Sequence, residues 1–428
     1  WDSPNVDALW EEACGKERWR GELGDMGEGI RRVPDEQLWA ARTRDRQRLV
    51  TVVRSRLARQ LGFRGADASA IERAAHAFDA NTLTLGFARR FVEYKRPNLL
   101  LRDPARLERL LTNAARPVQI VVAGKAHPDD PVGAALIAEW VAFAARPQIR
   151  DSVVFLEDYD ITLAEEMVRG VDVWVNTPRP PWEACGTSGM KVLANGGLNA
   201  STLDGWWAEA YRPDVGWSIA SGEIDAASAT ADDADAARLY DLLEREIVPA
   251  FYERDTLGVP RRWLERIRTS MAVLAPQFSA NRMMREYVRD IYAPAAELYR
   301  RRACGGATLG RDLAAWSGRL GRDWRSIHFG RVEVSEANGT RVISVPVYLG
   351  SIAPEEVAVE LYADSVGGEG SQCLTMTRAA DLPGAVHGVL YRVNVPGDRP
   401  MSDYTPRVIA RHPDARVPME AAFITWYR

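Results

Sequence analysis

The chain has 428 residues, of which 46% are apolar, so it can bury sizeable cores and is expected to form about two or three domains. Its formal net charge of -4 and pI near 5.9 give no general attraction to polyanions, which argues against nucleic acid as a partner. The most apolar long stretch, 132–145, is interrupted by Glu139, and no basic-then-apolar leader opens the chain. We therefore expect a cytoplasmic protein without a signal peptide or a membrane span.

Cysteine and histidine are scattered along the chain. The four cysteines show neither CxxC spacing nor the density of a disulfide scaffold, so reduced thiols are expected. The five histidines show no metal-binding spacing and no HExxH motif, and we predict no bound metal.

The first segment, residues 1–78, is predicted to be a helical lead-in. Apolar residues recur every four positions from Leu49 to Leu61, Pro34 can begin that helix, and Gly62 can end it. The arginines on the intervening face are expected to be solvated.

From residue 79 to about 302, short β-branched runs alternate with helical patterns, which predicts a Rossmann-like parallel sheet covered by helices. The runs are TLTLGFA (82–88), VQIVVA (118–123), VVFL (153–156), VDVWV (171–175) and LNASTL (198–203). The acidic segment 222–236 is expected to be a surface loop, and Ser279 is a candidate N-cap of a later helix.

The last segment, residues 303–428, is predicted to be a separate small domain. The glycine-rich run CGGATLG (304–310) is the candidate boundary, and one more helix follows it. The remaining short alternating runs, separated by Gly, Pro and Asn turns, predict an antiparallel β-sandwich.

Polar residues gather directly after the predicted parallel strands, where open α/β sheets bind ligands. The string ARRFVEYKRP after the first run carries Arg89, Arg90, Lys95 and Arg96, which could form an oxyanion clamp. A solvated turn whose charges pair with nearby acids is the alternative. The third run is followed by Tyr159 and then by the string TLAEE, a predicted capping box that begins the next helix.

The most informative segment follows the fourth run and reads NTPRPPWEACGTSGMKVLANGG. A proline-stiffened loop delivers Glu183, and Gly186, Thr187 and Ser188 then offer N–H groups and hydroxyls where a helix begins, which favours a phosphate. The string is not a P-loop, because the residue after Lys191 has no hydroxyl for magnesium.

Lys191 lies about one turn inside that apolar helix, beside the predicted anion site. A lysine there is costly unless its charge is paired or lost in a Schiff base with an aldehyde. Pyridoxal phosphate supplies both an aldehyde and a phosphate. A lysine that reaches out to solvent is the alternative.

These residues resemble the α-glucan (glycogen, starch or maltodextrin) phosphorylases, especially the shorter bacterial type. The resemblance rests on RRFVEYKR, AGKAHP, FLEDYD and, above all, EACGTSGMKVLANGGLNASTLDGWWAEAY, and it covers about residues 80–300. The flanking segments also look like the carboxy-terminal portion of that type. The resemblance therefore implies the carboxy-terminal half of a GT-B two-domain glycosyltransferase, without the amino-terminal domain, and the chain is expected to be a fragment.

The resemblance assigns cofactor residues one by one. Lys191 matches the lysine that binds pyridoxal 5'-phosphate covalently, and Gly186, Thr187 and Ser188 match the loop around the cofactor phosphate. Arg89 matches a lysine that contacts this phosphate. Tyr159 matches a tyrosine close to it.

It also assigns substrate residues. Arg90 and Lys95 match cations that bind the substrate phosphate, and together with Lys191 they are the catalytic candidates. Glu183 matches the carboxylate that holds hydroxyls of the reacting glucose, and Ala184, Cys185 and Gly186 follow it in the substrate-binding loop. Three positions depart from the long-chain enzymes, because Val92, Asp160 and Cys185 stand where those enzymes have histidine, arginine and serine.

The implied reaction is reversible phosphorolysis of terminal α-1,4-linked glucose to glucose-1-phosphate, with the cofactor working through its phosphate. The implied partners are an α-glucan or maltodextrin, inorganic phosphate and the missing amino-terminal domain, and a homo-oligomer is compatible with the sequence. Because the active site of such enzymes lies between two domains, the isolated chain is expected to be inactive.

Two alternatives stay open at this point. A nucleotide-sugar-dependent glucan synthase would share the fold and Glu183 but would carry glutamate in place of Lys191. A non-catalytic glucan-binding fragment is suggested by Trp206, Trp207 and two later tryptophans, Trp316 and Trp324, because aromatic faces stack on sugars. Burial in a core is the more common fate of tryptophan.

Overall fold

The computed structural model describes residues 1–18, 23–219, 229–337, 340–365, 370–396 and 399–428. The chain separates into two compact units, Trp1–Arg285 and Glu286–Arg428. The glycine-rich run proposed as the boundary lies inside the second unit. There the backbone of helix α14 (Ala293–Asp323) leaves helical φ and ψ at Cys304, Gly305, Gly306 and Ala307. The division into three functional segments stays a prediction.

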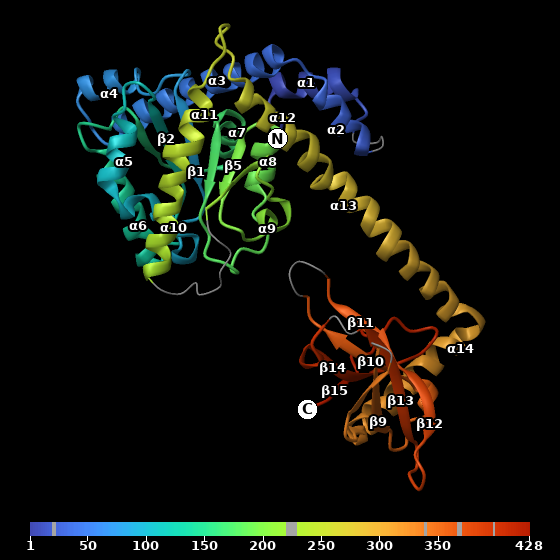
Figure 1. Ribbon diagram of the computed structural model, residues 1–428. Coiled ribbons are helices and arrows are strands. Elements are labelled where there is room, and N and C mark those ends of the chain that lie inside the picture. The colour runs from blue at the N-terminus through green and yellow to red at the C-terminus, as the bar shows by residue number, and fades with distance from the viewer. Residues whose placement is uncertain (19–22, 220–228, 338–339, 366–369, 397–398) are drawn as a thin grey trace. The chain divides into compact units, whose positions relative to one another are not determined.

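Unit 1 is built on a six-stranded sheet in which all neighbouring strands are parallel (Figure 1). The strands are β1 (Leu83–Ala88), β2 (Val118–Ala123), β3 (Val153–Leu156), β4 (Val173–Asn176), β5 (Leu198–Ser201) and β6 (Gly216–Ser218). Their order, β3-β2-β1-β4-β5-β6, is that of a doubly wound α/β sheet and reverses between β1 and β4. The predicted parallel sheet is confirmed.

Helices cover both faces of this sheet. They are α1 (Pro4–Cys14), α2 (Leu23–Arg31), α3 (Asp35–Phe63), α4 (Ala68–Ala74), α5 (Pro104–Leu111), α6 (Pro131–Ala144), α7 (Ile161–Gly170), α8 (Ser188–Ala194), α9 (Trp206–Ala210), α10 (Ala229–Leu242), α11 (Val248–Tyr252) and α12 (Arg261–Gln277). Helix α13 (Ala280–Glu286) follows α12 and buries none of its residues. Alternate strand residues face opposite layers, since Val153 and Phe155 join a core with α5, α6 and α12, whereas Val154 and Leu156 join one with α3, α7 and α8. No described helix is long and apolar enough to span a membrane.

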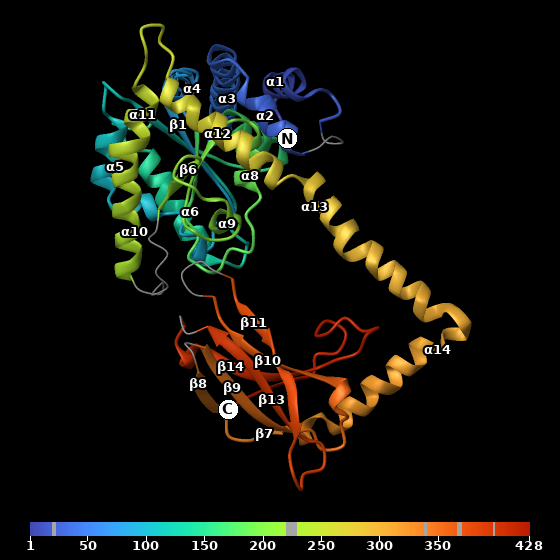
Figure 2. The same cartoon turned by 45° about the vertical axis from the view of Figure 1, so that its right-hand side comes forward.

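Helix α3 follows the sequence prediction in its bounds but not in its polar face. It begins directly after Pro34 and ends one residue past Gly62, and α1 and α4 pack against it (Figure 2). The arginine face is solvated only in part, because Arg48 is exposed as expected whereas Arg42 and Arg46 are each only 1% exposed. The prediction was wrong for the two buried arginines because they find partners that lie far away in the sequence.

Two further expectations concern the region before unit 2. The acidic segment was expected to be a loop, but α10 already begins at Ala229, and residues 222–228 lie outside the described part of the chain. Ser279 caps α13 as predicted, since its hydroxyl accepts a hydrogen bond from the Arg282 amide at 3.2 Å.

Unit 2 contains α14 (Ala293–Asp323) and two antiparallel sheets, ordered β11-β10-β14-β15 and β12-β13-β9-β7, with β8 also paired to β9. The strands are β7 (His328–Phe329), β8 (Glu333–Ala337), β9 (Thr340–Tyr348), β10 (Val357–Ala363), β11 (Gln372–Thr375), β12 (Thr377–Asp381), β13 (Gly388–Pro396), β14 (Tyr404–Ala410) and β15 (Ile424–Trp426). Residues of both sheets and of α14 form one hydrophobic cluster. The antiparallel character predicted from the sequence is confirmed.

Candidate active site at the carboxyl edge of the parallel sheet

The candidate residues follow the carboxyl ends of β1 and β4, the neighbouring strands between which the sheet order reverses. Arg89 comes directly after β1, and its amide donates to the Ala123 carbonyl at the end of β2, 3.3 Å away. The short helical turn η1 (Glu93–Lys95) follows, and Thr177, just beyond β4, donates its hydroxyl to the Lys95 carbonyl at 3.0 Å. The loops after the two central strands are therefore joined, at the place where α/β sheets bind ligands.

A buried charge cluster forms the centre of the site. Glu183 Oε2 accepts a hydrogen bond from Lys95 Nζ at 2.7 Å and from Arg89 Nη2 at 3.1 Å. All three side chains are at most 10% exposed. Burial lowers the pKa of Arg89, and the neighbouring Glu183 carboxylate only partly opposes this effect. The structure thus brings together Arg89 and Lys95, the two residues predicted to bind phosphate groups, and Glu183, the residue predicted to bind glucose.

Arg89 is not fully satisfied by this cluster. Its Nη1 atom is buried and has no hydrogen-bond partner within the described residues. A buried, unpaired guanidinium nitrogen is costly, and a bound anion would remove that cost. The unpaired Nη1 atom therefore favours a phosphate group at the site.

Backbone contacts fix the position of Glu183. Its amide donates to Asp204 Oδ2 at 2.8 Å, and the amide of Trp206 donates to the Cys185 carbonyl at 2.9 Å. Gly205 permits this closure, because its φ is +54° and a side chain there would place Cβ 2.5 Å from the Cys185 carbonyl oxygen. The loop carrying Glu183 is tied to the start of α9.

Lys191 lies in α8, with its ammonium 3.8 Å from the centroid of the Trp1 ring. No acidic side chain pairs with it in the described part of the chain, so this cation–π contact takes the place of an ion pair. Ser188, the first residue of α8, accepts a hydrogen bond from Trp174 Nε1 at 3.2 Å. Thr187, directly before the helix, is exposed, and its side chain does not cap the helix. Gly186 adopts a left-handed φ of +81°.

The other candidates differ in how closely they approach the cluster. Tyr159 is partly buried, and this burial raises the pKa of its phenol. The positive charge of Arg89 opposes the rise, which indicates an electrostatic interaction between the two side chains. Arg90, Ala184 and Cys185 are exposed. The Cys185 side chain still loses part of its contact with water, which raises the pKa of its thiol.

Two sequence interpretations at this edge are wrong. Arg96 is not part of an oxyanion clamp, because its Nη1 pairs with Asp232 at 2.9 Å and with Asp235 at 2.7 Å, which anchors α10. The predicted capping box after β3 is also wrong. Asp160, not Thr162, caps α7, and its carboxylate accepts from the Leu163 amide at 2.7 Å.

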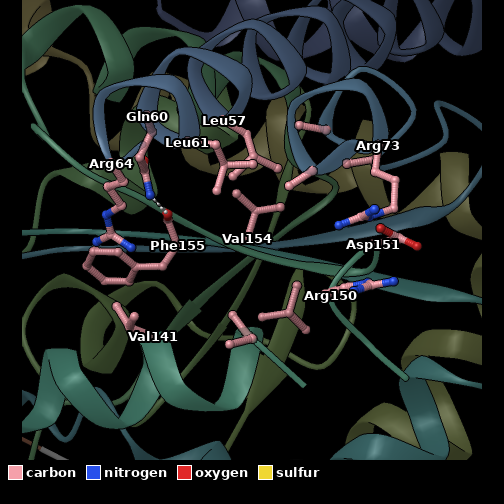
Figure 3. A pocket seen from close by; sticks show the side chains of 16 residues that line it. Leu57, Gln60, Leu61, Arg64, Arg73, Val141, Arg150, Asp151, Val154 and Phe155 are labelled. Atoms are coloured by element: carbon pink, nitrogen blue, oxygen red, sulfur yellow. Dashed lines mark hydrogen bonds between the residues drawn. The ribbon is translucent and has the colours of Figure 1, made fainter. Parts of the chain in front are cut away.

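A separate pocket of about 250 Å³ lies between α3, α4, α6 and β3, lined mainly by apolar side chains, with Arg73, Arg150 and Asp151 at one end and Arg64 at the other (Figure 3). None of the candidate residues lines it. No group of three or more metal-ligating His, Cys, Asp or Glu side chains occurs among the described residues.

Comparisons with known proteins address the family directly. Residues 67–215 match the carbohydrate phosphorylase profile, and residues 324–428 match the glycogen phosphorylase C-terminal domain. Over 99% of its length the chain is 39% identical to a glycogen phosphorylase of Mycobacterium tuberculosis (strain ATCC 25618 / H37Rv), of which it covers 50%. The chain belongs to the carbohydrate phosphorylase family.

Other phosphorylases show the same partial coverage. The chain is 40% identical over 68% of its length to the glycogen phosphorylase of Aquifex aeolicus, covering 42% of that protein. It is 36% identical over 80% of its length to the maltodextrin phosphorylase of Thermococcus litoralis, covering 40% of it. The chain spans about half the length of the curated relatives it matches. The resemblance drawn from the sequence motifs, to the carboxy-terminal portion of the phosphorylases, is thereby confirmed.

Three further residues lie at this candidate site but were assigned no role from the sequence. Asp204 holds the Glu183 amide, the Tyr94 ring lies 4.8 Å from Lys95 Nζ, and Trp182 is 66% exposed directly before Glu183. The first two stand inside the motif strings, where acidic and aromatic residues were available as a signal. The exposure of Trp182 has no signal in the sequence.

Proposed function

We propose that this chain takes part in the reversible phosphorolysis of terminal α-1,4-glucosyl residues of glucans to glucose-1-phosphate, with pyridoxal phosphate as cofactor. The observation that carries the proposal is the buried cluster of Arg89, Lys95 and Glu183, in which the Arg89 Nη1 atom still lacks an acceptor. Family membership supports this reaction class, and the unsatisfied Arg89 cation supports an anionic ligand at this particular place.

The residues present fit the cofactor. Arg89 has a buried donor to spare, Thr187 offers a hydroxyl that makes no capping bond, and the Lys191 amine is free of any carboxylate within the described residues. Pyridoxal phosphate, when bound, would supply an aldehyde for Lys191 and a phosphate that acts beside the substrate phosphate.

The side chains of this chain would act mainly by electrostatics. Two phosphates brought close together repel, and Arg89, Arg90 and Lys95 would screen them through charge-assisted hydrogen bonds of roughly 1.5–3 kcal/mol each. Glu183 balances Arg89 and Lys95 while no phosphate is present. When phosphate groups bind Arg89 and Lys95, the Glu183 carboxylate would become available to accept hydrogen bonds from glucose hydroxyls.

The chain covers half of its relatives, so we also propose that it supplies only the carboxy-terminal half of the active site. In this proposal unit 1 is the carboxy-terminal domain of a GT-B glycosyltransferase, the two sheets of unit 2 form a β-sandwich, and the enzyme works in the cytoplasm. A maltodextrin or longer α-glucan and inorganic phosphate would bind where this domain meets the amino-terminal one.

Covalent trapping tests the cofactor assignment. The chain contains only four lysines, Lys16, Lys95, Lys125 and Lys191, so borohydride reduction in the presence of pyridoxal phosphate and peptide mapping gives a clear answer. We expect the pyridoxyl adduct on Lys191, its loss in Lys191→Ala and its retention in Lys125→Ala, which removes an exposed lysine at the same sheet edge. An adduct distributed over the other lysines would contradict the assignment.

Activity tests the half-site proposal separately. With glucose-1-phosphate and maltodextrin, the isolated chain should release no phosphate above the Lys191→Ala background. Robust turnover would refute the half-site proposal while leaving the cofactor assignment intact.

A further inference from the structure

The described tryptophans of this chain differ widely in exposure. The four that suggested a sugar-binding role in the sequence lie in cores, with exposures of 4% for Trp206, 0% for Trp207, 4% for Trp316 and 7% for Trp324. Trp182 is 66% exposed, although a tryptophan side chain normally gains much free energy from burial. The exposed ring therefore needs a reason that the fold alone does not give.

The backbone around Trp182 is held on both sides, so the ring stands on a fixed base. The Trp182 amide donates to the Arg179 carbonyl at 3.0 Å, and the Arg179 amide donates to the Tyr94 carbonyl at 2.7 Å. On the other side, the next residue, Glu183, donates its amide to Asp204. The loop is thus joined to η1 and to α9, while the indole itself points to solvent.

Trp182 is paired with a second aromatic ring of the same site. The centroids of Trp182 and Tyr94 lie 6.0 Å apart, with an interplanar angle of 33°. The Lys95 ammonium lies 4.8 Å from the Tyr94 centroid and also binds Glu183. The Tyr94 ring therefore contacts the buried charge cluster, and the Trp182 ring lies next to Tyr94, so that the two rings form an apolar surface beside the cluster.

We propose that Tyr94 and Trp182 form a sugar-stacking platform, which binds a glucosyl ring of the α-glucan next to the one held by Glu183. A glucose ring has C–H groups on its faces and hydroxyls at its rim, so it suits a site that combines aromatic faces with a carboxylate. Trp182 is in this view a binding and specificity residue for the glucan chain. The inference rests on the proposed function and adds a second contact for its substrate.

Calorimetric titration of the purified chain with maltoheptaose tests the platform. Trp182→Ala should weaken binding about five- to tenfold, the range expected for the loss of one aromatic stacking contact. Trp182→Phe should retain most of the affinity. The matched control is Trp426→Ala in unit 2, where the tryptophan is 39% exposed and should leave maltoheptaose binding unchanged. Because Trp182 is exposed, circular dichroism should show the same fold in all variants.

The platform is overturned if Trp182→Ala binds maltoheptaose as tightly as the unaltered chain, or if the unaltered chain does not bind maltoheptaose at its highest soluble concentration. The pyridoxyl adduct on Lys191 is an independent readout. An adduct together with unchanged Trp182→Ala binding would remove the platform and keep the proposed reaction, whereas the absence of the adduct would count against the reaction itself.

Discussion

The two edges of the parallel sheet in unit 1 each bury a cluster of cations, but only one cluster is complete. At the amino edge, Arg46 donates to Asp172 at 3.2 Å and to the Ala80 carbonyl at 3.0 Å, and Arg42 donates to the Asn195 carbonyl at 3.0 Å. No nitrogen of these two arginines is buried without a partner in the described structure. At the carboxyl edge, Arg89 Nη1 is left without one.

The difference supports the proposal that the amino-edge cluster is structural and the carboxyl-edge cluster binds an anion. Asp172 also accepts the Thr84 amide at 3.0 Å, so its carboxylate joins α3 to the starts of β1 and β4. Burying charge is tolerated there because no fully buried nitrogen of the two arginines lacks a partner among the described residues. Burying Arg89 beside Glu183 leaves a donor over, which is what a site for an external anion requires. In this proposal the buried donor that Arg89 leaves unpaired is available to a ligand, whereas the buried donors at the amino edge stabilise the fold.

The largest expected effect comes from breaking the complete cluster. Asp172→Ala leaves two buried guanidinium groups without their carboxylate and the Thr84 amide without its acceptor. We expect the free energy of unfolding to fall by about 3–5 kcal/mol. Urea denaturation checks this, with hydrogen exchange of β1 and β4 reporting on unit 1.

The matched control is Asp214→Ala, which removes the carboxylate of a pair with Arg212 whose side chains are 48% and 55% exposed. It should change stability by less than about 1 kcal/mol. Equal losses in both variants would mean that the amino-edge cluster is no more structural than a surface pair.

A smaller and different effect is expected at the carboxyl edge. Arg89→Met removes a buried nitrogen that has no partner, but it also removes one of the two cations bound to Glu183, which keeps Lys95. The free energy of unfolding should therefore fall by less than in Asp172→Ala. Affinity for pyridoxal phosphate should fall tenfold or more, because a hydrogen bond to a charged group is worth roughly 1.5–3 kcal/mol. Fluorescence titration with the cofactor measures the second quantity.

Arg212→Met serves as the control, since this exposed arginine pairs only with Asp214 in the interactions described. It should alter neither stability nor affinity. If Arg89→Met lowered the free energy of unfolding by several kcal/mol while cofactor affinity stayed unchanged, Arg89 would have a structural role like that of Arg42 and Arg46.

Much of unit 1 could be predicted from the sequence because the strands of its parallel sheet are buried on both faces. Such strands appear as unbroken β-branched runs, and β2 and β3 occupy the predicted residues 118–123 and 153–156. The strand β6 was missed, since its three residues, GWS, carry no β-branched side chain. The start of α10 was missed because its acidic residues pair with Arg96, a contact that joins positions 136 and 139 residues apart.

The candidate site was only partly predictable for the same reason. The rule that ligands bind after the carboxyl ends of strands pointed to the loops after β1 and β4, which meet in the structure. It could not show that Glu183 pairs with Lys95 and Arg89, which are 88 and 94 residues away, or that Trp182 is exposed while Trp206 and Trp207 are buried. Those facts depend on how the loops after β1 and β4 meet.

Asp160 gives the smallest expected effect and resolves a position at which the chain departs from the long-chain enzymes. It lies at the carboxyl edge, yet its carboxylate caps α7 through the Leu163 amide, and this hydrogen bond lowers the pKa of Asp160. Asp160→Ala should cost about 1 kcal/mol of stability, whereas Asp160→Asn should keep most of the cap. Cofactor affinity should change in neither variant.

The pH dependence of this contribution has a definite sign. A carboxyl whose pKa is lowered by folding stabilises the folded state above its ordinary value of 3.8 and loses that contribution as the pH falls through the still lower folded value. The stability difference between the unaltered chain and Asp160→Ala should therefore be largest near neutral pH and shrink below about pH 3.8. If Asp160→Ala instead weakened pyridoxal phosphate binding at constant stability, Asp160 would belong with Arg89 on the ligand-binding side of the contrast between the two edges.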